Sequence, residues 1–267
     1  MIFKKKNILK ILLALLLGIT FYLGSIYIKN NFFNTSVDNF YNKTSNKINW
    51  KPYNEILKMS VSKEGKVNYK LIKDSIYLLD EVIKELNQKG IGTNLTVKEE
   101  LSNWINIYNL FTIKLISNHY PLKSITKLHP KNYIPLVNTV WHRKEFYING
   151  NAISLDQIEH EILRERFKEP RIHFAINCAS ESCPVLRAEA YEAKRIENQL
   201  EDQTLIFLND KSKNKFEGNK NEISPIFSWF RADFGGIDGV LNFINDRKTI
   251  DKKLPTKFTT YDWSLNE

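Results

Sequence analysis

The chain begins with a long apolar segment, and this feature restricts what the rest of it can be. Residues 8–28 contain a single charged side chain, Lys10. A stretch of this length can cross the hydrocarbon core of a bilayer as a helix. Lys4 to Lys6 precede it, and by the positive-inside tendency they predict that this end stays in the cytoplasm. We therefore expect a single-pass anchor, residues 1–30, in the cytoplasmic (inner) membrane, with the remaining chain outside the cytoplasm.

A cleaved signal segment is the alternative to a retained anchor. It would need a shorter apolar region and a small-residue cleavage site, and Gly24-Ser25 offers only a weak one. Residues 31–54 are rich in Asn, Ser, Thr and Lys, which is typical of a linker. We expect the rest to form one globular domain, residues 55–245, followed by a C-terminal tail, residues 246–267.

Length and composition favour one folded domain after the anchor. The chain has 267 residues, of which 42% are hydrophobic and 12% aromatic, so the disordered and disulfide-dense classes are poor fits. Lysines of the N-terminal segment supply much of the net charge of +9, and the later lysines alternate with acids. We therefore expect no nucleic-acid partner. The 10 glycines form no phosphate-binding loop, and we expect no cofactor.

A long buried helix is predicted in the first half of the domain. Thr96 and Glu99 have the spacing of a capping box, and the helix should end before Pro121. Its middle is apolar on nearly every side, which indicates burial. Asn106 and Asn109 lie in this middle part and must find hydrogen-bond partners inside the protein. They either contact substrate or hold a neighbouring loop.

Apolar residues at helical spacing predict three further helices. They cover residues 71–86, with an end at Gly90; residues 189–208; and a segment that begins at Ser224-Pro225 and contains Trp229. We expect the apolar side chains of these helices, Trp229 included, to pack in the core.

A hairpin and another helix are predicted before the segment that contains both cysteines. Asn149-Gly150 lies between two short β-prone runs and predicts the hairpin turn. A helix over Leu155–Phe167 should follow, with Ser154 as its cap. Glu159 falls on the apolar face of that helix, and His160 lies towards its polar margin. A buried carboxylate needs a partner because loss of solvation raises its pKa, so Glu159 is a candidate functional residue.

Both cysteines of the chain follow a predicted strand. Residues 171–177 alternate between large apolar and other side chains, which predicts a half-buried strand that carries His173. This strand leads into a loop that contains Cys178 and Cys183. The exits of strands are common places for catalytic groups because a rigid element positions a mobile one.

Nucleophilic catalysis is the first of three interpretations of the cysteine cluster. Cys178 would be the nucleophile, and either His173 or His160 would accept its proton. Glu159 would orient the imidazole or act as the general acid. Asn177 or the backbone N–H of Cys178 would help to form an oxyanion hole. An offset of five residues on a straight strand points His173 away from Cys178, an objection that does not apply to His160.

The other two interpretations are structural. A metal site could be built from His173, Cys178 and Cys183, with His160 as a further ligand, although this spacing is unusual for zinc. A disulfide between the two cysteines would simply fix the loop, as is common in an oxidising compartment.

Three motifs together resemble one protein family. They are Trp104-Ile-Asn-Ile-Tyr-Asn109, Ser154-Leu-Asp-Gln-Ile-Glu-His-Glu-Ile-Leu-Arg164 and Pro170-Arg-Ile-His-Phe-Ala-Ile-Asn-Cys-Ala-Ser-Glu-Ser-Cys-Pro184. In this order they resemble the domain of unknown function 547 (DUF547), and the resemblance covers roughly Tyr53 to Asn242. It implies a fold similar to cysteine peptidases with a Glu, His and Cys constellation. The positions that match these motifs are Glu159, His160, His173 and Cys178.

We therefore expect an α+β fold with a single globular domain, similar to cysteine peptidases, behind an N-terminal transmembrane helix. The expected function is thiol-dependent hydrolysis or acyl transfer at an amide or ester bond of a peptide or acyl substrate. The expected catalytic residues are Cys178, His173, Glu159 and His160, the expected substrate-binding residues are Asn106, Asn109 and Asn177, and no metal is expected. The alternative is a non-catalytic, membrane-anchored binding or assembly module in which the same residues form a buried polar network.

Overall fold

The computed structural model describes residues 36–44, 47–135 and 137–267. Residues Phe40–Glu267 form one compact unit, and the other unit, Met1–Asn39, contributes only its last residues to the described part. Within the described residues, no helix is long and apolar enough to cross a membrane. The apolar segment on which the anchor prediction rests, residues 8–28, lies outside them.

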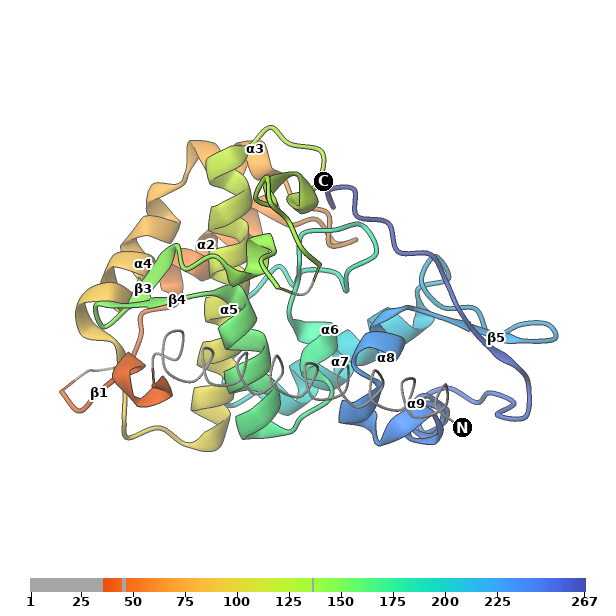
Figure 1. Ribbon diagram of the computed structural model, residues 1–267. Helices are drawn as coiled ribbons and strands as arrows, with labels where there is room; N and C mark the ends of the chain where they lie inside the picture. Colours follow the sequence, from red (N-terminus) through yellow and green to blue (C-terminus); the bar gives the residue numbers. More distant parts are fainter. Residues whose placement is uncertain (1–35, 45–46, 136) are drawn as a thin grey trace, which may run out of the picture. The chain divides into compact units, whose positions relative to one another are not determined.

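Helices dominate the unit Phe40–Glu267, and short strands pair in separate places (Figure 1). The α-helices of the described part are α2 (Lys51–Ser60), α3 (Tyr69–Asp74), α4 (Tyr77–Lys89), α5 (Val97–His119), α6 (Ile172–Ala175), α7 (Ile196–Asn209), α8 (Ile226–Trp229) and α9 (Gly236–Asn245). A π-helix covers Gln157–Phe167, and short 3₁₀ helices cover Val37–Phe40, Ile125–Leu128, Val140–His142 and Arg231–Phe234. The predicted mixture of helices and strands in one globular unit is confirmed.

Six short strands form three two-stranded sheets within the described residues. They are β1 (Tyr41–Asn42) with β2 (Ile91–Gly92), β3 (Phe146–Ile148) with β4 (Asn151–Ile153), and β5 (Asn221–Ile223) with β6 (Thr256–Phe258). The first and third pairs are parallel, and β3 and β4 are antiparallel. Asn149 and Gly150 both have positive φ between β3 and β4, as a type I′ hairpin turn requires, so this prediction is confirmed.

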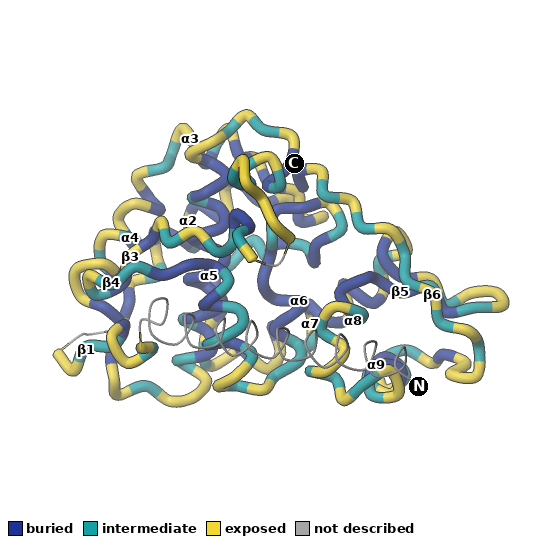
Figure 2. Tube along the Cα trace, viewed as in Figure 1, coloured by how far each residue is buried: buried dark blue, intermediate teal, exposed yellow. Residues whose placement is uncertain are grey.

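Helix α5 forms the centre around which the site is built. Its predicted capping box is present: the Thr96 N–H donates to Glu99 Oε2 at 2.9 Å, and the Glu99 N–H donates to Thr96 Oγ1 at 3.3 Å. The middle of α5 is buried on every side, as Figure 2 shows. α3 and the π-helix both pack against it. Because of this burial, every polar side chain in the middle of α5 must bind another part of the chain.

A second core lies among the short helices that follow the π-helix. Phe174 of α6 is fully buried, and its ring packs against Phe207 of α7, Phe227 of α8 and Phe243 of α9. Figure 1 shows these four helices together on one side of α5. This aromatic core fixes α6, and α6 in turn leads directly to Cys178.

The prediction of a strand over residues 171–177 is wrong. The structure forms α6 at Ile172–Ala175, with an extended backbone only from Ile176 onward. The Ile172 and His173 N–H groups donate to the carbonyls of Glu169 and Pro170, which starts the helical turn. All four residues of α6 are buried, so the alternation of apolar and other residues did not mark an inner and an outer face.

Three predicted helices also differ in detail. The pattern over residues 71–86 is divided between α3 and α4 at Ser75, whose N–H caps the carbonyls of α3, while the end at Gly90 is confirmed. The helix predicted from residue 189 begins only at Ile196. Trp229 was expected in the core, but it is 50% exposed.

The segment predicted as an ordinary helix over Leu155–Phe167 is mainly a π-helix. Its predicted cap is present, since the Gln157 N–H donates to Ser154 Oγ at 3.1 Å and Gln157 Oε1 accepts from the Ser154 N–H. In a π-helix the repeating hydrogen bond joins residues five apart. Glu159 and Arg164 therefore lie on the same side, one turn from each other.

Candidate functional site

Cys178 lies at the point where the extended backbone after α6 enters a loop. Both Cys178 and Cys183 are free cysteines; Cys178 is partly exposed and Cys183 is buried. The Cys178 N–H donates to Cys183 Sγ at 2.8 Å, which holds the two residues together. The loop therefore places two thiols side by side rather than a disulfide.

The residue after the cysteine turns the chain sharply. Ala179 is buried and has a φ of 63°, in the left-handed region that costs a non-glycine residue about 1–2 kcal/mol. The Ala179 N–H donates to Asn177 Oδ1 at 2.8 Å, and Asn177 Nδ2 donates to the Pro184 carbonyl at 2.7 Å. These bonds close the loop on itself and fix the direction of the Cys178 side chain.

Two hydroxyl groups surround the sulfur of Cys178. Ser180 Oγ lies 3.1 Å and Tyr261 Oη 3.3 Å from Cys178 Sγ, and the two hydroxyls are 3.1 Å from each other. Burial raises the pKa of Cys178, but the hydrogen bonds to its sulfur, from Cys183 first and then from the hydroxyls, outweigh burial and lower the pKa to about 7. Burial and the neighbouring thiolate raise the pKa of Tyr261, so it remains a donor.

Tyr261 reaches this position because the C-terminal segment, residues 259–267, lies along the cysteine loop. The Glu181 N–H donates to the Ser264 carbonyl at 2.8 Å, and the Ser182 N–H donates to the Asp262 carbonyl at 3.2 Å. In Figure 1 this segment is the dark blue trace that ends at the label C. Sequence analysis missed Tyr261 because only tertiary pairing brings a residue so far along the chain to Cys178.

Glu159, on the buried side of the π-helix, binds a tyrosine of α5. Tyr108 of α5 lies with its hydroxyl 3.2 Å from Glu159 Oε2. Burial, and then the negative charge of Cys178, raise the pKa of Glu159 to about 8, and Arg164 lowers it only in part. Near neutral pH these pKa values favour a proton on Glu159 while Cys178 can ionise.

Of the two predicted histidines, His173 faces a different group, Asp233. His173 is buried, and its Nε2 lies 2.7 Å from Asp233 Oδ2, while its ring stacks on Phe230 at 3.9 Å. Arg164 holds the same carboxylate with two bonds, at 2.6 and 2.7 Å. Burial lowers the pKa of His173 despite the neighbouring carboxylate. Sequence analysis missed Asp233 because it lies on the 3₁₀ helix Arg231–Phe234, far from the motifs.

His160 lies at the edge of this histidine cluster. The Arg164 guanidinium lies with Nη1 2.9 Å from His160 Nδ1. Arginine can only donate, so Nδ1 accepts and the proton of the neutral ring is on Nε2, which faces Asp156 at 3.6 Å. Among the described residues, the side chains beside the Cys178 sulfur are the hydroxyls of Ser180 and Tyr261 and the Cys183 thiol, and not an imidazole. The structure therefore surrounds the Cys178 sulfur with hydroxyls and places both histidines in the cluster of Arg164 and Asp233.

The predicted substrate-binding amides all bind the chain itself. Asn106 Nδ2 and Oδ1 bond the carbonyl and the N–H of Tyr191, at 2.9 and 2.8 Å. Asn109 bonds the Ala175 carbonyl at 2.9 Å and the Asn177 N–H at 2.8 Å. Together with Asn177, whose amide closes the cysteine loop, they hold loops on the buried face of α5. We therefore treat the three as positioning residues.

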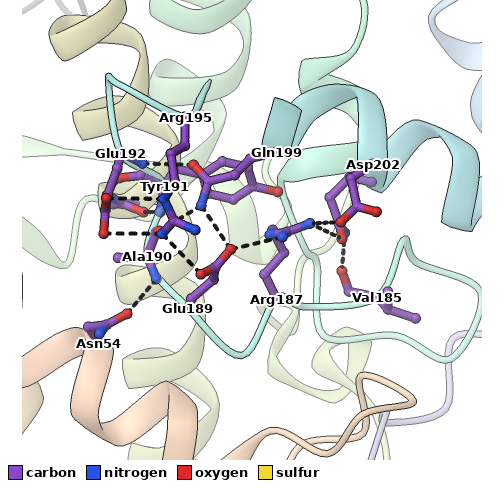
Figure 3. Close-up of polar contacts among 12 residues, drawn as sticks. Asn54, Val185, Arg187, Glu189, Ala190, Tyr191, Glu192, Arg195, Gln199 and Asp202 are labelled. Carbon is purple, nitrogen blue, oxygen red and sulfur yellow. Dashed lines mark hydrogen bonds and ion pairs between the residues drawn. The ribbon is translucent and has the colours of Figure 1, made fainter. Parts of the chain in front are cut away.

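The return loop between Pro184 and α7 is fixed by a network of ion pairs (Figure 3). Arg187 binds Glu189 on one side and Asp202 of α7 on the other, and Gln199 donates to Glu189 at 3.1 Å. Burial raises the pKa of Glu189, but hydrogen bonds from Arg187 and Gln199 outweigh it and lower the pKa to about 2. The loop that begins at the cysteines is therefore held at both of its ends.

A small hollow borders the cysteine loop, and Lys66 lines both this hollow and a larger one. The smaller one, of about 90 Å³, is lined in part by Ser180, Cys183 and Asn266. The larger one, of about 520 Å³, is open and lies over Tyr69 and Tyr120. Within the described residues no three His, Cys, Asp or Glu side chains gather so that they could hold a metal ion.

Comparison with known proteins gives one match. A family model described as "Protein of unknown function, DUF547" matches residues 93–208, which include α5, the π-helix, α6 and the cysteine loop. No curated protein and no solved structure matches the chain. Tyr261 and Asp233 lie beyond the matched residues.

Proposed function

We propose that this chain, which is a DUF547 domain-containing protein, is a thiol-dependent hydrolase or acyltransferase that acts on an amide or ester bond. The observation that carries the proposal is the setting of the Cys178 sulfur, which lies 3.1 Å from Ser180 Oγ and 3.3 Å from Tyr261 Oη. The pKa of Cys178 is lowered to about 7, and that of Glu159 is raised to about 8. Two titratable groups with shifted values of this kind are typical of an acid and a nucleophile in one site.

The first chemical step is attack by the Cys178 thiolate on the carbonyl carbon of the substrate. A C–S bond forms, and the electron pair of the C=O bond moves to oxygen. The Cys178 and Ala179 N–H groups are already bound to Cys183 and Asn177, so the hydroxyls of Ser180 and Tyr261 are the better donors to this oxyanion. Hydroxyl protons rotate freely, so both can turn from sulfur to oxygen as the charge moves.

Glu159 completes the reaction as the general acid and then the general base. The proton that it holds at neutral pH passes to the leaving amine or alcohol as the C–N or C–O bond breaks, which leaves a thioester on Cys178. The Glu159 carboxylate then accepts a proton from water, or from an acceptor amine or alcohol, as that molecule attacks the thioester. The acid or transferred acyl product leaves, and the thiolate is restored.

In this proposal the cluster of His173, Asp233 and Arg164 holds other residues in place and does not react with substrate. Their cluster, of which His173 is the buried member, connects the π-helix that carries Glu159 to α6, which precedes Cys178. The cysteine-peptidase-like fold implied by the family resemblance is part of the same proposal. The proposed mechanism differs from an imidazole-based mechanism because a carboxylic acid, rather than a histidine, exchanges protons with the substrate.

Alkylation of the full chain by iodoacetamide at different pH values tests this function. We expect Cys178 to react with an apparent pKa near 7, below the ordinary thiol value of about 8.5. Tyr261→Phe should raise that pKa because it removes a hydrogen bond to sulfur, while His173→Ala should leave it unchanged. Labelled peptides identified by mass establish that Cys178 is the residue that reacts.

Hydrolysis of p-nitrophenyl acetate by the same samples supplies the second measurement. Cys178→Ser should abolish the burst of nitrophenol, and Glu159→Gln should reduce turnover while Cys178 can still be alkylated. A Cys178 pKa at or above 8.5 would contradict the proposal and favour the binding or assembly module, for which Cys178→Ala costs only stability. A shift in pKa with His173→Ala but not with Tyr261→Phe would restore histidine as the base.

We also propose that residues 1–30 anchor the chain in the cytoplasmic membrane, with the domain outside the cytoplasm. The support is the apolar composition of residues 8–28 and the lysines before them. We expect the full chain to remain with membranes after washing at high pH and to be accessible to protease added from outside the cytoplasm. Release by the wash, or a mature chain that begins after Ser25, would contradict the anchor.

A further inference from the structure

An aromatic cluster lies directly beside the proposed nucleophile. It consists of four rings, which we call the aromatic platform: Trp141, Trp229 at the end of α8, and Tyr261 and Trp263 of the C-terminal segment. The Tyr261 ring lies 4.8 Å from Trp229 and 4.5 Å from Trp263, between ring centroids. Trp141 lies 5.7 Å from Trp263. Three segments far apart in the sequence therefore bring their aromatic residues to one place.

Packing alone does not explain this cluster. Trp104, in the core of the same unit, has no exposed surface, whereas half of the surface of Trp229 is exposed and the other three rings are only partly buried. A group of large apolar side chains in contact with water costs free energy, and such patches commonly mark binding sites. The platform is therefore a partly exposed aromatic surface beside the cysteine loop.

The geometry connects the platform to the reacting atom through one residue. The hydroxyl of Tyr261 lies 3.3 Å from Cys178 Sγ, and its ring packs on Trp229 and Trp263. A substrate whose carbonyl carbon is in contact with the sulfur thus has the platform within the length of a few bonds. The Trp229 and Trp263 rings are nearly parallel, with an angle of 19° and centroids 5.9 Å apart.

We propose that Trp229 and Trp263 form a subsite for a flat aromatic ring carried by the amide or ester that Cys178 attacks. This inference rests on the proposed function and adds the class of substrate. Aromatic faces bind another ring by offset or edge-to-face stacking beyond simple burial.

Three alkylating reagents test the subsite in the full chain: iodoacetamide, iodoacetanilide and N-hexyl iodoacetamide. Each rate at Cys178 is divided by the rate of the same reagent with free cysteine, which removes differences in intrinsic reactivity. We expect iodoacetanilide to react faster than iodoacetamide on this scale and to show saturation. Trp229→Ala should reduce this advantage roughly three- to tenfold, the range expected for one aromatic pair, and Trp229→Phe should retain most of it.

Tyr147→Ala is the matched control because Tyr147 is a similarly exposed aromatic residue on β3, outside the platform. It should leave the ratio of the two rates unchanged. An equal gain for the hexyl reagent would replace the ring subsite by a site for an alkyl chain. A ratio unaffected by Trp229→Ala, with a normal iodoacetamide rate, overturns the subsite and leaves the proposed function intact, whereas slow reaction with all three reagents overturns both.

Discussion

Asn109→Ala should lower the free energy of unfolding by about 2–5 kcal/mol and should also raise the pKa of Cys178 towards that of an ordinary thiol. The Asn109 amide is buried and satisfies the Ala175 carbonyl and the Asn177 N–H. Alanine leaves both backbone groups buried without partners, and each such group costs about 1–3 kcal/mol. The same change frees the backbone on which the cysteine loop is built. Urea unfolding and iodoacetamide alkylation of one sample measure the two effects.

Asn106→Ala is a closely matched control for this prediction. Asn106 lies one helical turn away on α5, is equally buried, and also bonds one carbonyl and one N–H, but both belong to Tyr191. We expect a similar loss of stability with an unchanged Cys178 pKa. Equal pKa shifts in the two variants would mean that general loosening of the fold, rather than the position of the loop, controls the thiol.

Phe174→Ala should destabilise the protein by about 3–5 kcal/mol, the range for removing a fully buried aromatic ring. The Phe174 ring packs at 4.9 Å on Phe207 and at 5.6 Å on Phe227, so its removal opens a cavity between α6, α7 and α8. The midpoint of urea unfolding should fall with little change in its slope.

Phe174→Leu serves as the graded control because leucine refills part of the cavity. We expect it to lose clearly less stability than the alanine variant. If both variants unfold at the same midpoint, the aromatic core is loose enough to close around the missing ring, and its role in fixing α6 would have to be abandoned.

Local signals in the sequence were sufficient for some elements. The capping box at Thr96 and the Asn149-Gly150 turn each depend on a few adjacent residues, and both form as predicted. α6 was missed because four residues buried on all sides lose the alternation that separates a strand from a helix. The π-helix was missed because a pattern of apolar residues does not reveal whether the backbone hydrogen bonds join residues four or five apart.

The candidate site could be predicted only in part for a related reason. Cys178 and Glu159 lie in recognisable motifs, and the need of Glu159 for a partner was evident from its place on an apolar face. Tyr261, which contacts Cys178, and Asp233, which contacts His173, carry no local signal, because each is an ordinary residue in its own segment. Tertiary contacts alone bring Tyr261 to the sulfur and Asp233 to the histidine.

The position of Tyr261 has a consequence for the order of events during synthesis. Tyr261 is made 83 residues after Cys178, and the segment that carries it is joined to Val67 and Lys123 as well as to the cysteine loop. Chains emerge from the ribosome from the N-terminus onward, so the cysteine loop is synthesised before the C-terminal segment that packs along it. Until that last segment is in place, the sulfur lacks one of its hydroxyl donors. We therefore expect the Cys178 thiol of the nascent chain to react slowly. Its reactivity should rise only when the C-terminal segment has packed along the cysteine loop.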